Sequence, residues 1–110
     1  MRSYLIDELS GPDLSSMKGF LKRNSVKSAL DDLFWVECPT ELLGATQIGH
    51  LECGPHVFAV EVGADSVKLE LFIRSLKRMN CTCQAFCTPQ QRDFILKYAH
   101  RMIQELDIHA

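Results

Sequence analysis

Cysteine and histidine fall into two short clusters along the chain, and they are the residues whose types and spacing could do chemistry. The first cluster contains His50 and Cys53, and the second contains Cys81 and Cys83. Thiolate sulfur and imidazole nitrogen are ligands that zinc prefers, and two such pairs complete one tetrahedral shell. The pattern therefore suggests a single zinc ion held by these four side chains.

The spacing within each pair decides how well it suits one ion. His50 and Cys53 are three residues apart at the expected end of a helix, so their side chains share one face. Cys81 and Cys83 also share a face of an expected strand, but there their β-carbons lie about 6.5–7 Å apart. Two sulfurs on one tetrahedral zinc lie only about 3.8 Å apart. The strand must therefore bend or bulge at this point, and His56 or Cys87 is an alternative ligand.

Two other interpretations of the cysteines stay open. Free cysteine is among the most buried residue types, so these thiols could simply fill the interior of a sheet, with His50 as a helix-end imidazole. Alternatively, one cysteine is a nucleophile with His50 or His56 as its base. Cys53 suits that role poorly, because the negative end of a helix dipole disfavours a thiolate.

Length and composition are those of an ordinary globular protein. The chain has 110 residues, 46% hydrophobic and 24% charged, which favours one compact domain over residues 1–110. The net charge is −2 with both signs spread along the chain, so nucleic-acid binding is not expected. No apolar run approaches the ~20 residues that cross a bilayer, so no membrane partner is expected either.

Cysteine usage also suggests a compartment. The chain has five cysteines, an odd number, and Asp7 and Glu8 interrupt the N-terminal residues before any apolar export signal can form. Free thiols of this kind fit a reducing environment better than a disulfide framework. We therefore expect a cytoplasmic protein.

Hydrophobic spacing in the first half of the chain predicts alternating strands and helices. A strand over 33–37 ends at Pro39, which cannot donate to a sheet. Thr40 caps a helix that runs through Cys53 and ends at Gly54 in left-handed geometry. The remaining elements expected in this half are a strand over 3–8, a helix over 12–23 and a helical turn over 26–31.

The second half predicts an antiparallel meander followed by a helix. Alternation favours strands over 57–62 and 67–74, and a third strand over 80–87. Thr88, Pro89 and Gln91 form the capping box of the last helix. The order β-α-β-α-β-β-β-α indicates a two-layer α+β fold, in which a mainly antiparallel sheet of four or five strands is packed by two or three helices.

The last helix presents an unusually wide apolar face. Its apolar positions between Phe94 and Leu106 cover an arc of about 180°, more than one sheet contact requires. We therefore expect that this face also contacts a second partner, either another protein or a second copy of the chain in a homodimer.

Several short motifs resemble those of small bacterial proteins of unknown function. The motifs are Leu33-Phe34-Trp35 to Pro39, Gln47, His50, Cys53-Gly54-Pro55, Leu69-Glu70-Leu71, Cys81-Thr82-Cys83 and Thr88-Pro89-Gln90-Gln91-Arg92. The resemblance covers about two-thirds of the chain. It implies a bacterial cytoplasmic protein and assigns no role to any residue.

These observations support three function hypotheses. The first is a non-catalytic interaction or regulatory module, self-associating through the last helix or binding another protein. The second is a small zinc-binding protein whose site at His50, Cys53, Cys81 and Cys83 is structural or sensory. A cysteine-dependent enzyme ranks third, because no arrangement that activates a thiol is visible.

Overall fold

Seven strands among the described residues form an antiparallel sheet in the order β1-β5-β4-β3-β2, with β6 beside β4 and β7 beside β6. The computed structural model describes residues 2–108. The strands are β1 (Ser3–Ile6), β2 (Val26–Lys27), β3 (Leu33–Glu37), β4 (His56–Val62), β5 (Val67–Glu70), β6 (Phe72–Ser75) and β7 (Ala85–Phe86). The helices are α1 (Gly11–Asn24), α2 (Ala45–Ile48) and α3 (Pro89–Glu105), with 3₁₀ turns η1 (Thr40–Leu42) and η2 (Leu51–Cys53). The expected α+β class with an antiparallel sheet is therefore confirmed, with more strands than the four or five expected.

Strand β4 is the centre of the sheet. It pairs with β3 along most of its length, with β5 at its C-terminal end and with β6 at its start. The strand expected over 67–74 is interrupted at Leu71. Val60 of β4 pairs with Leu69 of β5, whereas Val57 of β4 pairs with Arg74 of β6, so the pairing register with β4 changes across the interruption. The Leu71 N–H donates to the Arg2 carbonyl (3.0 Å), which continues the pairing of β5 with β1. This break brings Ser75, at the end of β6, opposite His56 at the start of β4.

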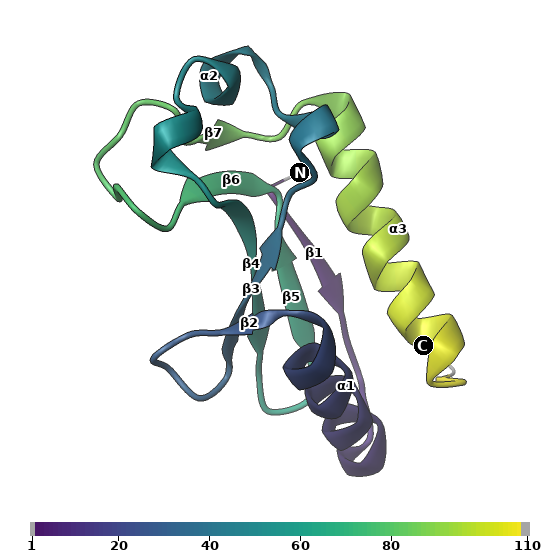
Figure 1. Cartoon of the computed structure of the whole chain (residues 1–110). Helices are drawn as coiled ribbons and strands as arrows, with labels where there is room; N and C mark the ends of the chain where they lie inside the picture. Colours follow the sequence, from purple (N-terminus) through teal and green to yellow (C-terminus); the bar gives the residue numbers. More distant parts are fainter. Residues whose placement is uncertain (1, 109–110) are drawn as a thin grey trace.

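Helices α1 and α3 pack against the sheet and build one core (Figure 1). Alternate residues of β3, β4 and β5 face this core, because side chains along a strand point to opposite sides of a sheet. The fully buried large side chains of the core include Phe34 and Phe58 from the sheet, Met17 and Leu21 from α1, and Ile95 and Met102 from α3.

Side-chain caps begin both α1 and α3, and the cap of α3 is the one expected from the sequence. The Ser10 hydroxyl accepts the Asp13 N–H (3.2 Å), and the Thr88 hydroxyl accepts the Gln91 N–H (3.2 Å). The Gln91 side chain in turn accepts the Thr88 N–H (2.9 Å), which completes the expected capping box.

Three predictions for residues 26–54 were wrong. Residues 26–31 contain a short strand and turns rather than a helical turn, because Val26 and Lys27 pair with β3. The single helix expected from Thr40 through Cys53 is divided into η1, α2 and η2, with Gly44 and Gly49 at the breaks. Gly54 has a φ of −66° rather than left-handed geometry.

The last helix uses most of its wide face inside the chain. Ile95, Ala99 and Met102 are buried, and Phe94, Tyr98, Ile103 and Leu106 also pack against the core. Within residues 2–108 no helix has both the length and the apolar character needed to cross a membrane.

Candidate metal centre

His50 and Cys53 lie on the short loop that leads into β4. His50 caps the start of the turn η2 and Cys53 is the last residue of this turn, and the Cys53 N–H donates to the His50 carbonyl (2.9 Å). Side chains three residues apart are nearly eclipsed in a 3₁₀ turn, so both project from the same side. The expected shared face is therefore present, although a 3₁₀ turn and not the end of a long helix produces it.

Cys81 and Cys83 lie in two successive turns between β6 and β7, not on the strand expected over 80–87. The Cys81 N–H donates to the Arg78 carbonyl (3.1 Å), and the Gln84 N–H donates to the Cys81 carbonyl (3.4 Å). Only Ala85 and Phe86 form a strand. The turns supply the bend that two thiolates on one ion require, and the Cys83 N–H lies 3.5 Å from the Cys81 sulfur.

The sheet brings these two loops together. The first loop enters β4 at His56 and the second leaves β6 at Ser75, and these two residues pair across neighbouring strands. Both loops must therefore begin at the same end of the sheet, where Figure 1 shows α2, β6 and β7 close together. This explains how residues about 30 positions apart in the sequence meet.

The donor atoms of His50, Cys53, Cys81 and Cys83 all lie within 4.8 Å of one another. The sulfurs of Cys53 and Cys81 are 3.5 Å apart, and the Cys81 sulfur is 3.3 Å from His50 Nδ1. Two sulfurs bound to one tetrahedral zinc are separated by about 3.8 Å. The cluster could therefore hold a single metal ion with only small side-chain movements.

A buried serine joins the two loops next to the cluster, and a glutamine braces the second loop. The Ser75 hydroxyl donates to the Cys53 carbonyl (2.6 Å) and accepts the Arg78 N–H (2.9 Å). Gln84 accepts the Ser75 N–H through its side-chain oxygen (3.0 Å) and donates to the Met79 carbonyl (2.6 Å). These bonds hold the backbone on either side of the metal-ligating positions, as groups around a metal site commonly do.

A second buried network ties the cluster to α3. Gln47 donates to the Cys83 carbonyl (2.8 Å), while its side-chain oxygen accepts the Gly44 N–H (2.7 Å) and the Gln91 amide (3.1 Å). Gln91 also donates to the Leu42 carbonyl (2.9 Å). The sequence predicts only a helix cap at Gln91, and no local signal indicates that Gln47 reaches a loop 36 residues away.

The three thiols of the cluster differ in acidity. Hydrogen bonds from the backbone and side chain of Cys83 lower the pKa of Cys81 to about 7. Burial raises the pKa of Cys83 to about 12, and burial followed by the neighbouring Cys81 raises the pKa of Cys53. Cys81 is therefore the most acidic of the three thiols, and a bound cation would require all three to lose their protons.

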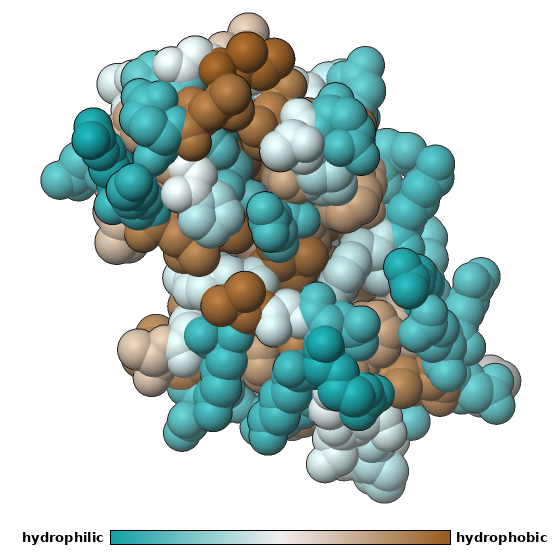
Figure 2. Space-filling model, in the orientation of Figure 1, coloured by the Kyte–Doolittle hydropathy of each residue, from teal (hydrophilic) through white to brown (hydrophobic). Residues whose placement is uncertain are grey.

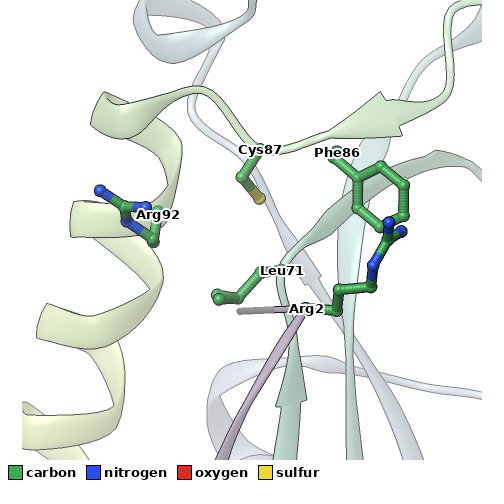
Figure 3. Close-up of a pocket in the computed structure, with 5 residues that line it drawn as sticks. All are labelled: Arg2, Leu71, Phe86, Cys87 and Arg92. Atoms are coloured by element: carbon green, nitrogen blue, oxygen red, sulfur yellow. The ribbon is translucent and has the colours of Figure 1, made fainter.

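The two alternative ligands lie outside this group of four. His56 is buried, and burial followed by the neighbouring His50 lowers its pKa. Cys87 lies at the start of α3 and lines a separate small cavity of about 220 Å³ with Arg2, Leu71, Phe86 and Arg92 (Figure 3). Burial raises the pKa values of Cys87 and Cys38 to about 11, which argues against either as a nucleophile.

Comparison with protein-family models, with curated proteins and with solved structures gives no match.

Proposed function

We propose that this chain is a zinc-binding protein in which one Zn²⁺ ties the loop before β4 to the loop after β6. His50, Cys53, Cys81 and Cys83 supply the four ligands. The observation that carries the proposal is the convergence of four zinc-preferring donor atoms within 4.8 Å from two separate loops. Three thiolates and one imidazole are a common ligand set of structural zinc sites.

The spacing of the donors favours one ion over a multinuclear iron–sulfur cluster. In such a cluster, several irons and sulfides lie between the cysteine sulfurs and hold them apart. Here the Cys53 and Cys81 sulfurs are only 3.5 Å apart. That separation suits two ligands of the same tetrahedral ion.

A structural role for the ion is favoured because four protein ligands fill its coordination shell. Catalytic zinc usually has three protein ligands and an open position for water, whereas this site offers four. Cys53 and Cys83 are each 0% exposed, so substrate has no approach to the ion from their side. We therefore assign the ion to holding the loops together, and not to activating water.

The test is the metal content of untagged protein, measured by elemental analysis together with native mass spectrometry. We expect about one zinc per chain, lost in Cys53→Ser and Cys81→Ser and retained in the matched variant Cys87→Ser. A chain free of metal after purification and after incubation with zinc would contradict the proposal. So would zinc binding that survives both ligand substitutions.

A second candidate function is the interaction module. It is favoured by exposed apolar side chains near the two segments that carry the four proposed ligands, residues 40–55 and 76–84, which we call the metal loops. Ile48, Leu51 and Met79 are 60%, 62% and 71% exposed, and Figure 2 shows hydrophobic residues gathered at the end of the molecule that carries α2. Exposed apolar groups of this kind often mark protein contacts. The mass of the intact species in the same native spectrum distinguishes a monomer from a homodimer.

A further inference from the structure

Cys81 is the ligand thiol that solvent can reach. Cys53 and Cys83 are 0% exposed, whereas Cys81 is partly exposed. Together with Arg78, Met79 and Asn80 it lines an open surface cavity of about 460 Å³. A small oxidant can therefore approach the Cys81 sulfur through this cavity, while the other two sulfurs are covered by protein.

The buried Cys53 is placed to react with an oxidised Cys81. Their sulfurs are 3.5 Å apart, and a disulfide bond is about 2.05 Å long, so the sulfurs have to approach by about 1.5 Å. They belong to facing loops, so rotation of the two side chains can supply this movement.

A bond between Cys81 and Cys83 is less favourable. It would close a ring within a single turn whose backbone is already held at both residues. The Gln84 N–H donates to the Cys81 carbonyl, and Gln47 donates to the Cys83 carbonyl. A disulfide inside this turn would have to distort these bonds.

We propose that Cys81 is a site of modification by hydrogen peroxide, and that Cys53 resolves the modified residue as a Cys53–Cys81 disulfide, releasing the zinc. The proposal deepens the proposed function and rests on it, because the released ion is the structural zinc. Cys81 is thus a redox-sensitive ligand of that site.

The chemistry balances in two steps. The Cys81 thiolate attacks one peroxide oxygen, the O–O bond breaks and hydroxide leaves, giving the sulfenic acid. The Cys53 thiolate then attacks the Cys81 sulfur, the S–O bond breaks and a second hydroxide leaves as the S–S bond forms. The two thiolates lose two electrons and one peroxide gains them. Zinc stays divalent and departs because only His50 and Cys83 remain as ligands.

The test uses the full chain carrying Cys38→Ala and Cys87→Ala, two cysteines outside the cluster. The zinc-loaded protein is treated with a small molar excess of hydrogen peroxide, and released zinc is followed with a chromogenic chelator. Remaining thiols are then alkylated and the chain is cleaved with trypsin. Because Cys53 lies in the tryptic peptide 28–68 and both Cys81 and Cys83 lie in 79–92, mass spectrometry identifies the pair.

We expect release of the bound zinc together with a 28–68 to 79–92 disulfide in which the alkylated residue is Cys83. A disulfide confined to 79–92, or zinc retained with all three thiols intact, would overturn the inference while leaving the structural zinc site in place. A chain that takes up no zinc before oxidant contradicts the proposed function. In that case, the peptide map of the oxidised, zinc-free sample tests only whether Cys53 and Cys81 form a disulfide.

Discussion

At the scale of single residues, Ser75 does more for the metal centre than its size suggests. Its side chain is buried, and its hydroxyl bonds both the Cys53 carbonyl of one loop and the Arg78 N–H of the other. A hydroxyl can donate and accept at once, so one atom satisfies both buried groups. Alanine would leave each of them without its partner.

We predict that Ser75→Ala lowers the free energy of unfolding by about 1–3 kcal/mol, since buried groups left unpaired cost this much. It should also weaken zinc binding by about 10–100-fold, as removal of groups that support metal ligands typically does. Denaturant unfolding and competition with a zinc chelator measure the two effects. Ser16→Ala, on the exposed side of α1, is the matched control and should change neither. Equal behaviour of the two variants would show that Ser75 has no supporting role.

At the scale of elements, the N-terminus of α3 is joined to the metal loops through two buried amides. Gln91 caps its own helix through Thr88 and also donates to Gln47 (3.1 Å). Gln47 in turn holds the Cys83 carbonyl (2.8 Å). The helix that packs on the sheet therefore also sets the position of the loop that carries Cys81 and Cys83.

Replacing Gln91 with alanine should therefore affect both the helix and the site. We expect the unfolding free energy to fall by about 2 kcal/mol, because a cap and buried hydrogen bonds are lost together. Zinc affinity should fall as well, since Gln47 loses a partner. The control Gln90→Ala removes an identical side chain that is exposed, so it should leave the unfolding free energy and the zinc affinity almost unchanged. If Gln91→Ala lowers stability but leaves zinc affinity at the parent value, the network does not extend to the metal loop.

Elements with strong local signals could be predicted from the sequence. The last helix has its cap, its proline and its apolar face in one continuous segment from Thr88 to Leu106, and the strand over 33–37 agrees with β3. The division of residues 40–53 was missed because the stabilising partners of that segment, Gln91 and Cys83, are distant in the sequence. Local spacing contains no information about such contacts.

The cysteine and histidine spacing correctly identified which side chains meet, but not the backbone that brings them together. The two pairs of ligand residues in the sequence suggested one shared ion. The turns that place Cys81 and Cys83, however, depend on hydrogen bonds made by Ser75 and Gln84. Those residues look ordinary in the sequence. Their importance comes from the pairing of β4 with β6, which is a tertiary contact.

At the scale of the whole molecule, the hydrophobic core and the candidate metal centre are separate. The core cluster contains residues of both long helices and the central strands, but neither Cys53 nor Cys83 belongs to it. This differs from a classical zinc finger, which has little core without its metal. With the proposed zinc bound, the fold should therefore have two levels of stability, one set by the core and one by the ion.

We predict that removing zinc loosens the metal loops without unfolding the chain. Amide hydrogen exchange followed by mass spectrometry, with and without chelator, should show faster exchange over residues 40–55 and 76–84. Exchange in the core-facing part of α3 should stay slow, because Ile95, Ala99 and Met102 remain packed whether or not the ion is bound. Cys53→Ser should reproduce the zinc-free pattern without chelator, and Cys87→Ser should not. Uniformly fast exchange after chelation would instead mean that the core cannot stand alone, and that the energy of zinc binding is the folding energy of the entire chain.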